Sequence, residues 1–395
     1  MSRGAVTARG RERHMVRTLA DAVRDPRGCS VPGPSIGDGA DVEDLVEVAE
    51  REEVLGVLAV AFEARGVELP AAVATAADRA RLSHLQAARA LRTVARVLDA
   101  RGVRWVVVKG PAVASMWPAG QVSRTYEDLD VLIGRCDLPA ACEALVEAGF
   151  EHRNHNWGGF IDLGVAEIPL DDGSVVLDLH WNLVALADQR RDLCIDTEAL
   201  LDRARPDGMG IPGVATLAAA DAFVHLCCHA GLAGARSLRL LRDVHLAGAR
   251  VEPDEARAAL ARAGCARLAA PVLDRAVRWF GPLPSPTGGT SDARRICGHP
   301  GWIVLNRFVD GIWALVRGVR RPLHPGALVS SGRRGLRSSA AAFLERLTVA
   351  LRSRLGMRTL VSEGGALHWE TVGHGGSQRG LDDYLRYVAG ESHCG

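Results

Sequence analysis

Three aspartates in apolar surroundings carry the strongest chemical signal in this chain of 395 residues. Asp128 and Asp130 stand two apart in the run Asp128–Ile133, and Asp178 lies within the apolar run Val175–Trp181. Because side chains two apart in a strand point to the same face, Asp128 and Asp130 are expected to lie together. Buried carboxylates repel each other and lose their hydration. A divalent cation would offset both effects, so the pattern predicts an oxygen-ligand site suited to Mg²⁺.

A simpler explanation is that Asp128 caps a turn and Asp178 faces solvent. This explanation suits any single aspartate better than it suits all three together.

A second signal lies upstream, where Lys109 and Gly110 follow a short apolar run. At a strand-to-helix junction, glycine lets backbone amides approach a phosphate, and lysine adds a point charge. An ordinary turn would also explain this pair. Lys109 is nevertheless the single lysine among 48 basic residues.

Two further residues near the aspartates have two interpretations each. His180 lies two residues beyond Asp178, on the same expected strand face, and either lines the site or is a core histidine bonded to the backbone. Arg124 lies four residues before Asp128 and either neutralises phosphate charge or anchors the carboxylates from behind. The sequence leaves both choices open.

Two histidines, His225 and His229, are four residues apart in the helical segment Thr216–Arg250 and therefore share a face. With Cys227 and Cys228 between them, they invite comparison with a zinc site. The cysteines point to other faces of the helix, however, and no second ligand pair stands nearby in the sequence. We therefore expect the histidines to form a polar stripe that faces a ligand pocket.

Other polar and aromatic residues have structural explanations. Arg239 and Asp243, four apart, are expected to form an ion pair within one helix. Trp157 is retained as a possible contact to a nucleobase, although tryptophan in this region is more typical of a core. The core tryptophans are expected to be Trp105, Trp117, Trp157 and Trp181.

The elements that must position these residues follow from the apolar spacing. Residues 103–185 are expected to form a compact unit of about four strands and two helices, in which Asp171-Asp172-Gly173 makes a hairpin turn. Its expected strands are Trp105–Val108, 129–133, Gly159–Leu170 and Ser174–Trp181, and its expected helices are Ala112–Trp117 and Asp137–Ala148.

The rest of the chain has helical spacing. We expect an N-terminal helical region at 1–102, a helical domain at 214–280 that packs on the site, and a mostly helical region at 301–395. Gly281–Gly301, with three prolines, is expected to be a linker. Loops are expected at Gly28–Gly39, Arg203–Gly213 and Gly364–Arg379.

Composition excludes several classes of protein. The 48 basic and 47 acidic residues give a net charge of +1, which argues against a polymerase that holds nucleic acid by bulk positive potential. The chain has no run of 18 apolar residues, so we expect no membrane span. Its arginine-rich start lacks the apolar segment of a signal peptide. Nine cysteines without a C-x-x-C pair are typical of reduced thiols in the cytoplasm.

Three motifs together resemble a known family. Val108–Gly110, Arg124–Ile133 and Leu177–Trp181 are similar to the bacterial family of uncharacterised nucleotidyltransferases, within the polymerase β type superfamily. A weaker likeness continues through His225–His229 and Leu238–Asp243. The superfamily usually has Gly-Ser or Gly-Gly at the first turn, whereas this chain has Lys-Gly-Pro and therefore no hydroxyl there.

The resemblance implies an α/β (α+β) fold, with a small mixed-sheet core flanked by N-terminal and C-terminal helical regions. It also implies transfer of a nucleoside monophosphate from an NTP, with ATP expected first, to a small molecule, peptide or protein, in a tailoring role. The implied ions are two Mg²⁺, or Mn²⁺. The implied metal ligands are Asp128, Asp130 and Asp178, the last of which is alternatively a general base. The implied nucleotide contacts are Lys109, Gly110 and Arg124, and the implied acceptor contacts are His180, His225 and His229.

Two other functions stay open at this point. One is a protein AMP-transferase of the toxin–antitoxin type, although such chains tend to be much shorter. The other is a non-catalytic nucleotide-binding or scaffold protein on a degenerate transferase fold, against which the three retained aspartates argue.

Overall fold

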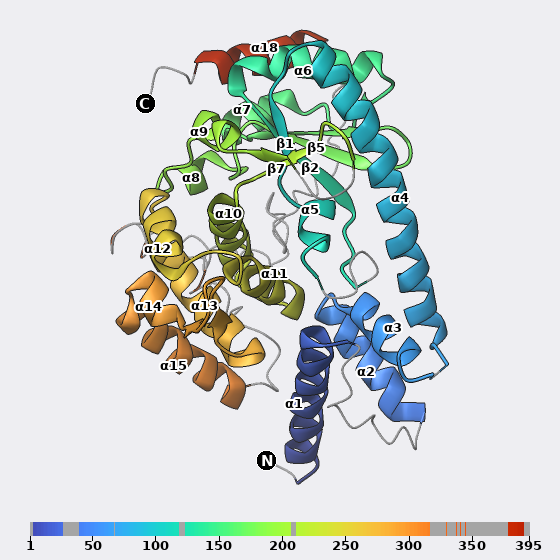
Figure 1. Cartoon of the computed structure of the whole chain (residues 1–395), viewed down its shortest axis with the longest axis vertical. Helices are drawn as coiled ribbons and strands as arrows, with labels where there is room; N and C mark the ends of the chain where they lie inside the picture. Colours follow the sequence, from blue (N-terminus) through green and yellow to red (C-terminus); the bar gives the residue numbers. More distant parts are fainter. Residues whose placement is uncertain are drawn as a thin grey trace.

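The computed structural model describes residues 3–26, 39–66, 68–117, 123–206, 211–316 and 378–390, together with residues 329, 337, 340 and 344. Figure 1 shows helices surrounding a mixed sheet. The strands are β1 Trp105–Val107, β2 Asp128–Ile133, β3 Glu151–His152, β4 Glu167–Asp171, β5 Val176–His180, β6 Arg205–Pro206, β7 Ala215–Thr216, β8 Leu283–Pro284 and β9 Thr290–Ser291.

The helices on the N-terminal side of β5 include the long α4, which runs along one side of the molecule (Figure 1). They are α1 Arg3–Arg24, α2 Gly39–Arg51, α3 Leu55–Glu63, α4 Ala71–Ala100, α5 Pro111–Ala114, the 3-10 helix η2 Arg135–Asp137, α6 Leu138–Glu147 and α7 Trp157–Leu163. The helices after β5 are α8 Ala187–Arg190, α9 Thr197–Asp202, α10 Ala219–Leu232, α11 Leu238–Gly248, α12 Pro253–Arg262, α13 Ala266–Phe280, α14 Ala293–Cys297, α15 Pro300–Val316 and α18 Gln378–Gly390. Within the described ranges, no helix is long and apolar enough to cross a membrane.

The main sheet has seven strands in the order β3-β4-β5-β2-β1-β7-β6. At its centre β2 runs parallel to β5 and antiparallel to β1. The register places Asp130 opposite Asp178 and Leu132 opposite His180. The sheet therefore extends past residue 185, because β6 and β7 join its edge beside β1.

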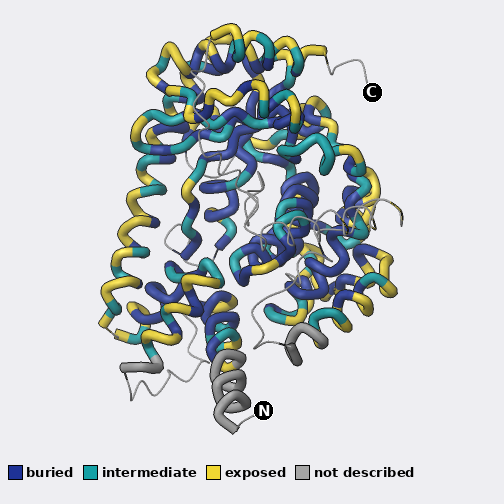
Figure 2. Tube along the Cα trace, turned by 180° about the vertical axis from the view of Figure 1, so that it is seen from behind, coloured by how far each residue is buried: buried dark blue, intermediate teal, exposed yellow. Residues whose placement is uncertain are grey.

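The two faces of this sheet differ in chemistry. Leu129, Val131 and Ile133 of β2 point to one face, where they are fully buried against helices α4 and α6. Asp128 and Asp130 point to the opposite face, which α9 and α10 approach. Figure 2 shows that burial is densest along the central strands and along α10 and α11.

Helices α10 to α14 form a second hydrophobic core that they share with the N-terminal helices α1 to α3. At the junction, Glu52 Oε2 accepts a hydrogen bond from the Leu238 amide at 3.0 Å. Glu53 Oε2 accepts hydrogen bonds from Ser237 Oγ at 2.7 Å and from Arg239 Nε at 3.0 Å. Residues far apart in the sequence therefore fix the start of α11.

Most of the expected elements are present. Strands β1, β2 and β5, helix α6 and the Asp171–Gly173 turn confirm the sequence predictions. In that turn Gly173 has a φ of +83°, and Asp171 Oδ1 accepts a hydrogen bond from its amide at 2.7 Å. This conformation favours glycine and closes the β4–β5 hairpin.

Two local predictions are wrong. The expected strand Gly159–Leu170 begins as helix α7, because Asn156 caps the helix through the Gly159 amide and Gly164 ends it in the left-handed conformation. Strand β4 starts only at Glu167. The helical segment Thr216–Arg250 is divided, since Ala235 has a φ of +49° between α10 and α11.

The expected linker Gly281–Gly301 is packed structure. It contains the β8–β9 hairpin and helix α14, and Leu283 and Ile296 are buried in the helical core. Apolar side chains between the prolines and glycines explain this packing. Most of the predicted loops Gly28–Gly39 and Gly364–Arg379 lies outside the described residues. Gly39 begins α2, and Gln378 and Arg379 begin α18.

Candidate active site

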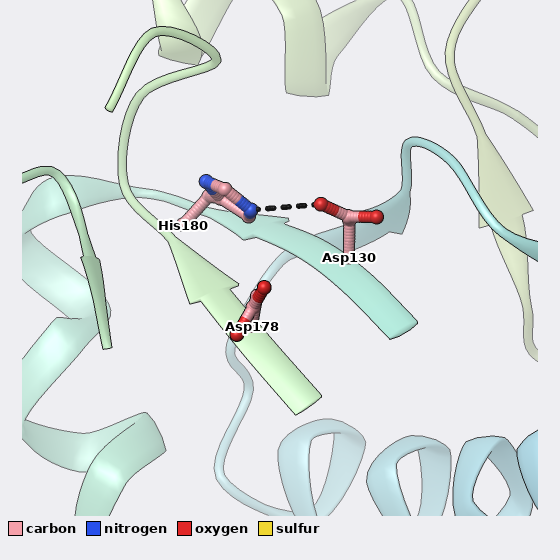
Figure 3. Close-up of side chains that lie close together, drawn as sticks. All are labelled: Asp130, Asp178 and His180. Carbon is pink, nitrogen blue, oxygen red and sulfur yellow. Dashed lines mark hydrogen bonds and ion pairs between the residues drawn. The ribbon is translucent and has the colours of Figure 1, made fainter. Parts of the chain in front are cut away.

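The polar face of the sheet brings three candidate ligands together. Asp130 of β2 and Asp178 and His180 of β5 each offer a ligand atom within 4.8 Å of the others. Figure 3 shows the two aspartates on neighbouring strands, with His180 directed toward Asp130. The parallel register explains this arrangement, because Asp130 pairs with Asp178 and His180 is two residues further along.

Asp130 is the centre of the cluster and is almost completely buried. Its Oδ1 lies 2.7 Å from Lys109 Nζ and 3.0 Å from His180 Nε2. Burial raises the pKa of this carboxyl, but the charges and hydrogen bonds of Lys109 and His180 outweigh burial and hold the pKa well below its usual range. Asp130 is therefore ionised near neutral pH.

The second oxygen of Asp130 has a different environment. Oδ2 is buried, and no atom of the described chain forms a hydrogen bond with it. A buried carboxylate oxygen without a partner is unfavourable unless a ligand satisfies it.

The pKa values of Asp128 and Asp178 are shifted upward, in the opposite direction to that of Asp130. The charge of Asp130, followed by burial, raises the pKa of Asp128 above its ordinary value. Burial, followed by Glu167, Asp128 and Asp130, raises the pKa of Asp178 well above its ordinary value. The carboxylates therefore form an excess of negative charge that Lys109 compensates only in part.

Glu167 is a fourth carboxylate that the sequence prediction missed. It lies at the start of β4, opposite His180 in the antiparallel register, and its Oε2 is 3.4 Å from His180 Nδ1, without hydrogen-bond geometry. Burial raises its pKa. The alternation of Glu167 with apolar Ile168 could have identified it. The predicted strand Gly159–Leu170 included the residues of α7, however, so the face of the strand on which Glu167 lies could not be assigned.

Gly110 positions the loop beside the aspartates. Its φ is +56°, and a Cβ atom there would lie 3.1 Å from the backbone oxygen of Asp128 and 3.5 Å from the Tyr126 ring. Glycine is therefore required for close packing of the turn against β2. This places Lys109 Nζ against Asp130 Oδ1, where burial would lower the pKa of the lysine but the charges of Asp130 and Asp128 raise it.

Arg124 lies beside the same cluster but is paired elsewhere. Its Nε and one terminal nitrogen donate to the two oxygens of Asp243 in α11, both at 2.9 Å. Trp117 Nε1 also donates to Asp243, at 2.7 Å. The predicted Arg239–Asp243 pair within one helix is therefore wrong, because Arg239 pairs with Glu53.

His225 and His229 lie on one face of α10, as predicted, with ring centroids 6.2 Å apart. His225 is 3% exposed, and neither ring nitrogen has a hydrogen-bond partner in the described chain. Burial, followed by the charge of Lys109, lowers its pKa to about 3. Burial also lowers the pKa of His229 well below its ordinary value. Both side chains are therefore neutral near neutral pH.

The donor set of the cluster fits a hard divalent cation. It combines several carboxylates, one unpartnered carboxylate oxygen and an excess of negative charge, which are the features that Mg²⁺ and related ions require. Imidazole from His180 would also suit Mn²⁺ or a softer metal. The residues therefore can hold a metal ion, and they leave its identity open.

The comparison with known families decides between the classes of protein that this geometry allows. The sequence profile described as "Uncharacterised nucleotidyltransferase" matches residues 38–281, which contain the whole sheet and the cluster. The chain belongs to this nucleotidyltransferase family. No curated protein matches the chain.

The nucleotidyltransferase is thus a transferase of phosphorus-containing groups, and membership implies an NTP as substrate. The fold agrees with the expectation of a mixed-sheet core with helical flanks. The match also covers α2 to α4, whereas α1 lies before its first residue.

One expected substrate contact is unavailable. Trp157 is 3% exposed and packs against Phe160 and against Tyr384 of α18, with ring centroids 5.4 and 5.7 Å away. Trp157 belongs to the apolar core on the face of β2 opposite the aspartates, so its suggested role as a nucleobase contact is wrong. The expectation that Trp105, Trp117, Trp157 and Trp181 belong to the core is confirmed.

Proposed function

We propose that the nucleotidyltransferase transfers a nucleoside monophosphate from an NTP, with ATP as the first candidate, to a hydroxyl of a small molecule, peptide or protein. The observation that carries this proposal is the unpartnered, buried Oδ2 of Asp130, in a cluster with excess negative charge. Asp128, Asp130 and Asp178 would hold Mg²⁺. The ion would neutralise triphosphate charge and polarise the transferred phosphoryl group.

The chain's own residues divide the remaining tasks. Lys109 and Arg124 supply positive charge for the phosphates, and Gly110 lets the turn that carries Lys109 approach β2. If Asp178 is not a metal ligand, it is the alternative general base that accepts the proton of the acceptor hydroxyl. The acceptor oxygen then attacks the α-phosphorus, the bond from that phosphorus to the oxygen bridging to the β-phosphate breaks, and pyrophosphate leaves.

His180, His225 and His229 are proposed to line the acceptor side. The unpartnered ring nitrogens of His225 support this assignment, because a neutral imidazole can donate one hydrogen bond and accept another. His180 also bonds Asp130, so it both lines the site and holds the orientation of that carboxylate.

Calorimetric titration with ATP, GTP, CTP and UTP tests the donor, with and without Mg²⁺, on wild type and on Asp130→Asn. We expect binding that requires Mg²⁺ and is lost in a folded Asp130→Asn variant. Incubation with NTP labelled at the α-phosphate then tests transfer to proteins, peptides and small molecules. Metal-independent binding, or equal binding by the variant, would contradict the metal assignment.

A further inference from the structure

The contact between Arg124 and Asp243 joins two parts of the chain that are 119 residues apart. Arg124 lies in the segment that leads into β2, and Asp243 lies in the middle of α11. Their side chains are 3% and 2% exposed, and the pairing is bidentate, with both distances at 2.9 Å. Trp117 adds a third hydrogen bond to the same carboxylate.

Stability alone is a weak explanation for such a pair. Removing two charges from water offsets much of their attraction, and apolar side chains of similar volume often stabilise a protein as well or better. The pair is instead suited to fixing one orientation, because a bidentate guanidinium–carboxylate contact has defined geometry. Arg124 is consequently held in a single position beside β2.

That position leaves one donor free. Arg124 Nη1 is buried, and no atom of the described chain accepts a hydrogen bond from it. The guanidinium charge also reaches the neighbouring cluster, since Arg124 lowers the pKa of Asp128 against the stronger upward effect of Asp130. A buried donor with a full positive charge, next to carboxylates suited to a metal, is complementary to a phosphate oxygen.

We propose that Asp243 is a positioning residue that holds Arg124 with its free Nη1 directed at the triphosphate of the substrate. This inference rests on the proposed function and deepens it, because it assigns to α11 a part in phosphate binding. Trp117 contributes by fixing the Asp243 carboxylate. Asp243 itself contacts no substrate.

The test measures binding of Mg²⁺ with inorganic triphosphate, and of Mg·ATP, by calorimetry. The first variant, Asp243→Asn, keeps an acceptor for Trp117 but removes the charge that orients Arg124. The second variant combines Arg124→Met with Asp243→Asn, so that no buried charge is left unpaired. The matched control is Asp221→Asn, which disrupts the bidentate pair of Asp221 with Arg203, at 2.8 and 3.0 Å, within the same helical region.

We expect Asp243→Asn to weaken triphosphate binding about tenfold or more, the loss of one charge-assisted hydrogen bond. The double variant is expected to regain thermal stability relative to Asp243→Asn but not to regain affinity. A third variant, Arg124→Met alone, should bind triphosphate as weakly as the double variant does, because the effect of Asp243→Asn passes through Arg124. The Asp221→Asn control should bind triphosphate as wild type does.

Wild-type affinity in either Asp243 variant would overturn the inference and leave the proposed function intact. Affinity that recovers together with stability in the double variant would show that the pair only joins the two parts of the chain. A wild-type protein that binds neither Mg·ATP nor Mg²⁺ with triphosphate would overturn the proposed function, and this inference with it.

Discussion

The carboxylates of the site should destabilise the metal-free protein, and Asp178→Asn tests this directly. Asparagine keeps the shape of the side chain and removes its charge. In the metal-free state we expect the variant to be more stable than wild type, although the substitution lies in a central strand. The reason is that burial and, after it, the negative charges of Glu167, Asp128 and Asp130 raise the pKa of Asp178.

The magnitude follows from the geometry. Ligand atoms of Asp130 and Asp178 lie within 4.8 Å of each other, and two unit charges at that distance repel by about 3.5 kcal/mol at an effective dielectric constant of about 20. Asp178 is partly exposed, and His180 attracts it, so solvent and the histidine reduce this value. We expect a gain of about 1–2 kcal/mol in the free energy of unfolding.

Urea unfolding at neutral pH and low ionic strength, with a chelator present, measures this gain. The control is Asp162→Asn, an exposed position on α7, which should change stability by less than about 0.5 kcal/mol. With excess Mg²⁺, wild type should gain more stability than Asp178→Asn, because only wild type retains the full ligand set. A variant less stable than wild type in chelator would refute the argument from charge repulsion.

Three further predictions concern other parts of the molecule. Lys109→Arg should fold normally but bind Mg²⁺ more weakly in calorimetry, because a guanidinium can occupy both oxygens of Asp130; unchanged binding would contradict this. Burial lowers the pKa of His245 to about 4, so protonation of this side chain favours the unfolded chain. Its contribution should lower the free energy of unfolding by up to about 3 kcal/mol as the pH drops from 6.5 to 4. His245→Gln should reduce that slope in urea titrations, and an unchanged slope would exclude the assignment. Among the described cysteines, a thiol reagent followed by mass spectrometry should label Cys136 and Cys194 rapidly and the five buried ones only after unfolding.

Period-two spacing was sufficient to predict the carboxylate pair from sequence. Asp128 and Asp130 share a face because β2 is a regular strand, and the apolar residues between and after them identify the buried face. The hairpin before β5 was equally local, since Gly173 alone supplies the required φ. Both features depend only on residues that are adjacent in the sequence, so they can be predicted from the sequence alone.

Contacts between distant segments were not predictable in the same way. Asp243 appeared to be a partner for Arg239 by helical spacing, but tertiary packing gives it to Arg124, which lies 119 residues away. Tyr384 of α18 donates a hydrogen bond to the backbone oxygen of Val165 and accepts one from Trp181 Nε1. No local pattern in either segment indicates this pairing.

The single lysine of the chain finds a physical explanation in the geometry of Asp130. The other 47 basic residues are arginine, and most positions evidently tolerate it. At position 109, a planar guanidinium with two parallel donors would match both carboxylate oxygens of Asp130. The compact ammonium of Lys109 contacts only Oδ1, at 2.7 Å, and leaves Oδ2 without a partner. Lysine therefore stabilises the buried aspartate and leaves Oδ2 open to the proposed metal ion, whereas arginine in the same place would take that oxygen.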